Sequence, residues 1–183
     1  MYLDGNLEMK DNCKFNHLIL DSNKDTSSLL DESYVSFCEC MNSDLKFMGK
    51  KILFKTEKDL QVMKELGFQH IVSMTKKFGM RLYEPNRMIY VPLIRQIISD
   101  CSSSKKCPHI AIYKDNKDIC IWCRNNKFLI VLTPRNKGYL LNTAYPVIYS
   151  HKINQIEKKI NENGLYELNL SDPAVVQTSE FVQ

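Results

Sequence analysis

The residues best suited to chemistry stand in two segments of the sequence. Gly138–Val147, GYLLNTAYPV, has the composition of a core strand that ends in a polar pair, Thr143 and Tyr145. An apolar helical stretch, NRMIYVPLIRQII, carries two arginines, Arg87 and Arg95, which an apolar stretch does not need for folding. Hydroxyls at a strand end beside guanidinium groups on a helix predict a surface that handles phosphate. The alternative is a β-rich core with ordinary surface arginines.

Strand geometry groups the Thr143 hydroxyl with three neighbours. Successive strand residues point to opposite faces, so we expect Tyr139, Leu141, Thr143 and Tyr145 to line one face. The Thr143 hydroxyl would then orient a phosphate, and Tyr145 would stack on a base or donate its phenol. The alternative is ordinary structure, because threonine is common in strands and a tyrosine beside a proline is common in packed cores.

Two histidines and two further arginines lie near these segments. His109 opens a predicted strand and His151 begins a predicted helix, and either imidazole would titrate near neutral pH as a general acid or base. Arg124 and Arg135 flank the central hairpin and would extend a basic substrate-binding groove. The alternatives are surface or capping histidines and solvated turn charges.

The charge of the 183-residue chain is unevenly distributed. Residues 1–48 hold nine acidic and four basic residues, a net charge of −5, whereas residues 49–183 hold 21 basic and 12 acidic residues, a net charge of +9. A basic body suits a polyanion partner, because neutralising phosphates releases counterions. The alternative is a lysine-rich composition with no such partner, since many of the lysines are scattered singly.

The first half of the sequence has few regular patterns. Weak periodicity and many Asp, Asn and Ser residues predict a loosely structured acidic extension over 1–48, with a turn of helix at Ser27–Asp31 and a short strand at Tyr34–Cys38. Beyond it, Ile52–Phe54 and Phe68–Val72 predict short strands. Between these strands, the pattern predicts a helix that starts at Thr56, with Asp59 as capping partner, and ends at Gly67.

The second half predicts helices followed by an antiparallel sheet. Pro85 suits the first turn of a helix, and Pro92 divides or kinks that helix before it ends near Asp100. Short turns separate four predicted strands, at 109–113, 119–124, 127–133 and 139–147. A helix at His151–Asn161 follows, and its isoleucines face the sheet: Ile153, Ile156 and Ile160.

This order of elements indicates an α+β domain over 49–164, followed by a tail over 165–183. The seven cysteines come without a visible secretory signal or an apolar run long enough to span a membrane. We therefore expect a reducing, cytoplasmic location with thiols that are mostly free and buried. Cys120 and Cys123 form CIWC, but strand positions three apart point to opposite faces, so we expect no metal site and no cofactor there.

The quoted motifs resemble a ribonuclease superfamily. Arg87, the VPLIR of Val91–Arg95 and the LLNTAYP of Leu140–Pro146, followed by a basic helix from His151, look like the phage-type branch of the barnase, EndoU, colicin and RelE nucleases. The resemblance covers about residues 81–160, a little under half of the chain. It departs from the family at Leu93, where an aromatic residue is usual.

The resemblance implies a fold and an activity. The fold would be N-terminal helices packed on a four-stranded antiparallel sheet, with a C-terminal helix. The activity would be metal-independent cleavage of RNA by its 2′-hydroxyl, with Arg95 and Arg87 gripping the phosphate, in a toxin, effector or phage factor delivered into a target or host cell. RNA and an immunity or antitoxin protein would be the partners, with no membrane association. The alternative is a non-catalytic nucleic-acid- or protein-binding module on the same fold.

Overall fold

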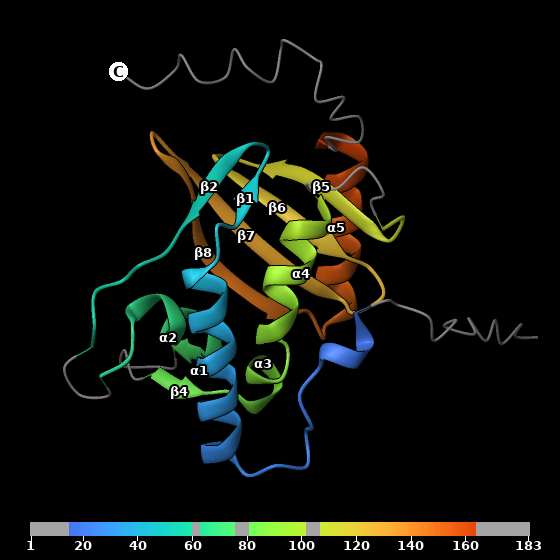
Figure 1. The fold of residues 1–183 in the computed structure, drawn as a ribbon. Helices are drawn as coiled ribbons and strands as arrows, with labels where there is room; N and C mark the ends of the chain where they lie inside the picture. The colour runs from blue at the N-terminus through green and yellow to red at the C-terminus, as the bar shows by residue number, and fades with distance from the viewer. Residues whose placement is uncertain (1–14, 60–62, 76–80, 102–106, 164–183) are drawn as a thin grey trace, which may run out of the picture.

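The computed structural model describes residues 15–59, 63–75, 81–101 and 107–163. A twisted sheet lies between helices on both of its faces (Figure 1). The helices are η1 (Asn16–Leu18, 3₁₀), α1 (Thr26–Asn42), α2 (Leu66–Val72), α3 (Pro85–Met88), α4 (Val91–Cys101) and α5 (Ser150–Asn163). The strands are β1 (Lys46–Phe47), β2 (Lys50–Leu53), β3 (Ser73–Thr75), β4 (Arg81–Tyr83), β5 (Ile110–Asp115), β6 (Asp118–Cys123), β7 (Phe128–Arg135) and β8 (Gly138–Pro146).

The main sheet is larger than the sequence predicts. The four predicted strands β5 to β8 form an antiparallel sheet, which confirms the α+β class and that part of the topology. Two further strands extend it, however, to six in the order β1-β2-β8-β7-β6-β5. β2 runs parallel to β8, with Ile52 opposite Tyr139 and Leu53 opposite Leu140, so the four-stranded antiparallel sheet is corrected to a six-stranded mixed one.

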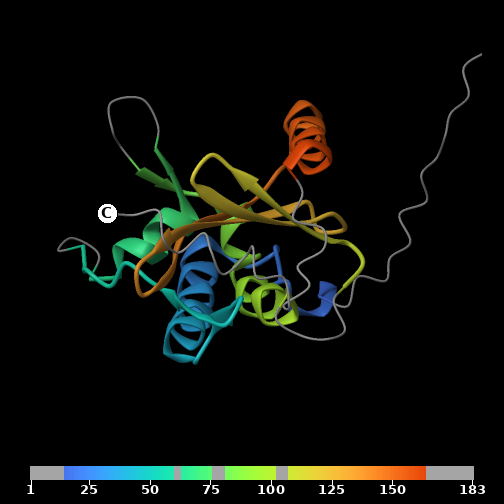
Figure 2. The same cartoon turned by 90° about the horizontal axis from the view of Figure 1, so that it is seen from above.

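The two faces of the sheet bury separate cores. The first core lies under α1 and α4, and the second lies under α5 (Figure 2). Alternation along β6 divides its side chains, with Ile121 and Cys123 in the first core and Cys120 and Trp122 in the second. Both faces of the central strands are therefore buried, which explains the apolar runs Ile119–Cys123 in β6 and Phe128–Leu132 in β7.

A β-bulge in β8 changes which face its side chains occupy. Leu141 pairs with Leu132, but Thr143 pairs with Val131, so Asn142 is an extra residue in β8. Before the bulge, Leu141 packs in the first core; after it, Tyr145 packs against the second. The predicted common face for Tyr139, Leu141, Thr143 and Tyr145 is therefore wrong, because one inserted residue reverses the alternation.

The sequence predicts a loose extension over residues 1–48, but its described part contains the helix α1, which packs in the first core. Asp25 caps α1 by accepting hydrogen bonds from Ser27 N at 2.9 Å and Ser28 N at 3.1 Å. The buried residues of α1 recur at helical spacing: Leu29, Ser33, Phe37 and Cys40. The strand predicted at Tyr34–Cys38 is thus part of α1, and Ser27–Asp31 is its first turn. Residues 1–14 and the predicted tail 165–183 lie outside the described residues.

The helix predicted from Thr56 to Gly67 begins ten residues later, as α2, and replaces the strand predicted at Phe68–Val72. Gly67 does not end this helix. Its amide donates to Lys55 O at 3.1 Å, and a Cβ on Gly67 would lie 2.9 Å from that oxygen. Glycine is therefore needed for close backbone contact at this position rather than for a helix C-cap.

The remaining helices follow the prediction. α3 starts at Pro85, and a break at 89–90 separates it from α4, which carries Pro92 in its first turn. α5 covers the second core with Ile153, Ile156 and Ile160, as predicted.

Gly138 provides a test of the β2–β8 junction. A Cβ on Gly138 would lie 2.1 Å from the backbone oxygen of Lys51, and backbone atoms cannot rotate away. We expect Gly138→Ala to lower the free energy of unfolding by about 3 kcal/mol in urea titrations. Lys137→Ala, in the exposed turn beside it, should change stability by less than about 0.5 kcal/mol. Equal stability of the two variants would contradict the parallel pairing.

Candidate functional site

The structure does not bring Arg95 and Thr143 together. Arg95 is exposed on α4, whose buried apolar residues face the first core. Arg95 acts electrostatically on the Cys40 thiol of α1, because burial raises the pKa of Cys40 to about 12 and the charge of Arg95 opposes this rise. Thr143 follows the bulge and shares the face of Tyr145, on the second-core side. The central pair of the nuclease prediction therefore lies on opposite faces of the sheet.

Arg87 meets Tyr145 instead. Its guanidinium carbon lies 5.0 Å from the centre of the Tyr145 ring, a cation–π contact. Arg87 also donates through Nη1 to the backbone oxygen of Ser73 at 3.1 Å. Burial lowers the pKa of Arg87 from its ordinary value, and Tyr145 and Glu84 oppose this effect. The side chain is therefore held in place by a ring and a carbonyl while it keeps its charge.

Two residues that the sequence analysis did not select complete this cluster. Arg81 on β4 donates through Nε to Ser73 Oγ at 2.9 Å and through Nη2 to His70 Nδ1 at 3.2 Å. Thr143 Oγ1 lies 3.4 Å from the backbone oxygen of His70, a long hydrogen bond. We call the five side chains on this face the arginine patch: His70, Arg81, Arg87, Thr143 and Tyr145.

The contacts of His70 define its protonation state. A guanidinium can only donate, so His70 Nδ1 accepts from Arg81 and the ring proton lies on Nε2. Burial lowers the pKa of His70, and the charges of Arg81 and Lys55 lower it further. His70 is consequently neutral at pH 7 and offers an N–H donor. It does not offer a free nitrogen that could act as a base.

The patch has excess positive charge. Within the described part of the chain, neither Arg81 nor Arg87 forms an ion pair with a carboxylate. Arg124 differs, because its Nε and Nη2 donate to Glu157 at 3.0 Å each. Trp122 Nε1 donates to the same carboxylate at 2.8 Å. Arg124 therefore links the end of β6 to α5, whereas the sequence predicts that it extends a substrate-binding groove.

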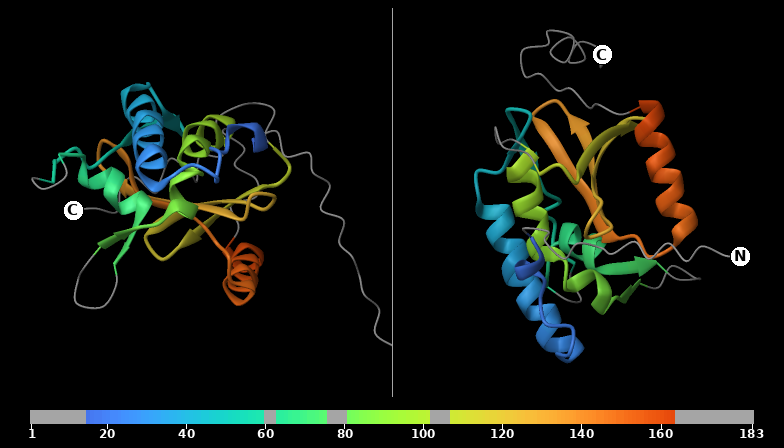
Figure 3. Two further views of the ribbon diagram at one scale, coloured as in Figure 1. Left: turned by 90° about the horizontal axis from the view of Figure 1, so that it is seen from below. Right: turned by 90° about the vertical axis from the view of Figure 1, so that its right-hand side faces the viewer.

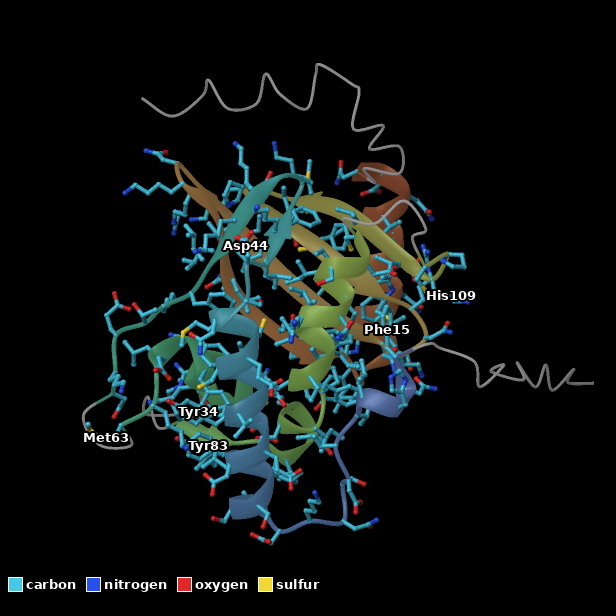
Figure 4. The ribbon with its side chains drawn as sticks, in the orientation of Figure 1. Phe15, Tyr34, Asp44, Met63, Tyr83 and His109 are labelled. Atoms are coloured by element: carbon cyan, nitrogen blue, oxygen red, sulfur yellow. The ribbon has the colours of Figure 1, made fainter. Side chains whose placement is uncertain are left out.

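The other predicted residues are dispersed. Arg135 is exposed at the β7–β8 turn, seven residues along β8 from Tyr145, which corresponds to roughly 23 Å of strand. His109 lies at the edge of the molecule opposite Tyr83 of β4 (Figure 4). His151 is exposed in the first turn of α5, with its ring 5.7 Å from that of Tyr149. Of these three residues, only His151 is close in sequence to a patch residue, since it follows Tyr145 by six positions.

Sequence patterns did not reveal the pairing of β3 with β4, which carries Arg81 to the patch. The strands are three residues each, and Ser73 pairs with Tyr83. This small hairpin and α5 project from the same side of the main sheet (Figure 3). A sequence feature that could have indicated Arg81 is its position four residues before Pro85, which starts α3, with Arg87 two residues after it.

The cysteines show no arrangement for a metal ion in the described residues. Cys120 and Cys123 face different cores, as predicted from strand alternation. In the same residues, no three side chains of His, Cys, Asp or Glu are grouped as metal ligands would be. No described helix is both long and apolar enough to cross a membrane.

Comparison of the chain with models of protein families, with curated proteins and with solved structures found no match. The resemblance to the ribonuclease superfamily therefore remains a prediction from the quoted motifs.

The coupling of His70 to Arg81 gives a test of the patch geometry. The His70 pKa should lie below 6.5 in an NMR titration, because the ring is partly buried beside two cations. Arg81→Gln removes one of these charges and should raise the pKa of His70. Arg95→Gln removes the same charge from the opposite face and should leave this pKa unchanged. An equal effect of both variants would contradict the geometry.

The tie between Arg124 and Glu157 should make stability depend on pH. Burial alone would raise the pKa of Glu157, but the hydrogen bonds from Arg124 and Trp122 outweigh it and lower the pKa below 4.5. The stabilisation is therefore complete above about pH 4.5 and is lost as the pH falls through the folded-state pKa.

Thermal melts of Glu157→Gln would measure this effect. At pH 7 its melting temperature should lie a few degrees below that of the wild type, and the gap should be smaller at pH 3. Glu162→Gln, on the same helix but in an exposed pair with Lys158 at 3.8 Å, should show no gap at either pH. A gap for Glu157→Gln that persisted unchanged at pH 3 would refute the proposed linkage.

Proposed function

We propose that this chain binds RNA through the arginine patch and does not itself cleave it. The observation that carries the proposal is the convergence of Arg81 and Arg87 on Ser73 without an ion-pair partner in the described residues. Fixed guanidinium groups with unused N–H donors suit phosphate oxygens. The net charge of +9 over residues 49–183 supports a polyanion as the partner.

The hydrogen-bonding inventory of the patch favours binding over cleavage. The guanidinium groups, the His70 Nε2–H and the Tyr145 hydroxyl can donate to a phosphate, whereas the Thr143 hydroxyl proton is already donated to the His70 backbone oxygen. Attack by a 2′-hydroxyl needs a base, and His70 cannot serve because Arg81 occupies its Nδ1. Burial raises the pKa of Tyr145, so its phenol stays protonated at neutral pH. The position of Arg95 also removes one of the two cations that the nuclease prediction placed on the phosphate.

RNA is the nucleic acid that the motif resemblance favours, since the LLNTAYP strand that supplies Thr143 and Tyr145 is part of that resemblance. Phosphate contacts alone would serve DNA equally well. DNA of the same sequence therefore belongs in the binding assay, and tighter binding to DNA than to RNA would contradict the choice of RNA.

Salt dependence of binding tests the patch with matched charge changes. The double variant Arg81→Gln/Arg87→Gln should bind a short single-stranded RNA more weakly, and the slope of log K against log salt should fall by about 1.4. The control Arg95→Gln/Arg135→Gln loses the same charge outside the patch, so its slope should match the wild type. Circular dichroism would verify that both variants are folded. Equal slopes for the two double variants would sink the proposal.

A cleavage assay separates binding from catalysis. Total RNA incubated with the purified chain in EDTA should remain intact. Fragments that appear with the wild type but not with the patch variant would mean that the chain is a metal-independent endoribonuclease centred on the arginine patch, and not a binding module.

A further inference from the structure

The start of α5 presents an aromatic surface that the fold does not use. Ile148 is 67% exposed and Tyr149 is 59% exposed, although both follow directly on β8 and the buried Val147. The Tyr149 ring lies beside the His151 ring, with centres 5.7 Å apart and planes 31° apart. Neither ring packs in the two cores of the described residues. The exposed Tyr149 ring, with the His151 ring beside it, thus offers an aromatic face to a ligand.

The backbone holds Tyr149 in a defined position. Its carbonyl oxygen accepts hydrogen bonds from Lys152 N at 3.0 Å and Ile153 N at 3.1 Å, which makes it the residue that begins the α5 hydrogen-bonding pattern. Val147, two residues earlier, is anchored by a 2.7 Å hydrogen bond from its amide to Lys127 O. The exposed ring is therefore carried on a segment fixed at both ends, as a preorganised binding residue requires.

The aromatic surface lies within reach of the arginine patch. Tyr149 follows Tyr145 by four residues, so their Cα atoms are at most about 14 Å apart. A short oligonucleotide spans such a separation. The charge is also favourable to phosphate, since the first turn of α5 contains His151 and Lys152 and no acidic residue.

We infer that Tyr149, supported by His151, stacks on an unpaired base of RNA whose phosphate lies in the arginine patch. This inference rests on the proposed function and adds to it that the RNA is single-stranded. Bases within a duplex are covered on both faces by their neighbours, so an aromatic side chain can stack only on a base outside a duplex. The phenol ring of Tyr149 supplies the stacking surface, and the cations supply sequence-independent affinity.

Fluorescence anisotropy with a labelled oligouridylate and a long RNA duplex, in which nearly all bases are covered on both faces, tests the inference. Tyr149→Ala should weaken binding to oligouridylate by about 5- to 150-fold, whereas Tyr149→Phe, which keeps the ring, should stay within about twofold of the wild type. Duplex binding should be the same for all three proteins. Val35→Ala is a control, because Val35 is 57% exposed on α1, which packs on the first-core face of the sheet.

Salt titrations distinguish failure of the inference from failure of the proposed function. Tyr149→Ala should keep the wild-type salt slope, since it removes no phosphate contact. If Tyr149→Ala binds oligouridylate like the wild type while Arg81→Gln/Arg87→Gln binds weakly, the stacking role is overturned and the arginine patch stands. Equal weakening of duplex and oligouridylate by Tyr149→Ala also overturns stacking. If the wild type binds no RNA, both the function and the inference fall.

Discussion

The bulge at Asn142 is the constraint on which the arrangement of this molecule depends. It divides β8 into a first half that pairs with β2 and faces the first core, and a second half whose Thr143 and Tyr145 face the side of α5. Without the extra residue, Tyr145 would point into the core beneath α4. The bulge therefore places a tyrosine where Arg87 can lie over it, and a local irregularity in pairing determines which face carries the site.

The arginines of this chain differ in whether a carboxylate neutralises their charge. Arg124 is neutralised by Glu157 and joins β6 to α5 across the second core. Arg81 and Arg87 are instead held by Ser73, His70 and the Tyr145 ring, none of which carries a negative charge. Holding two cations near each other costs free energy, which an anionic ligand would recover. This difference in partners, rather than the number of arginines, is the reason to assign binding to one face.

Sequence patterns predicted the elements whose signals are local. Strict alternation and short turns located β5 to β8, and Pro85 located the start of α3. Contacts between distant segments were not predictable in this way, because neither the parallel pairing of Ile52 with Tyr139 nor the close contact of Gly67 with Lys55 leaves a periodic pattern. The same limit applies to the site. Sequence patterns placed Arg87, Thr143 and Tyr145 in one site with Arg95. The structure brings Arg87 to the Tyr145 ring, but the bulge reversed the alternation that would have turned Thr143 and Tyr145 toward the α4 side.

Chemical-shift mapping tests the central claim, that the ligand-binding face is the α5 side of β8, most directly. Addition of a short oligouridylate to the isotopically labelled chain should shift backbone amides of residues 70–73, 81–87 and 143–152. Amides around Arg95 on α4, on the other side of the sheet, should not move. Shifts concentrated around Arg95 and the adjoining face of α1, with β4 and β8 unchanged, would contradict the account.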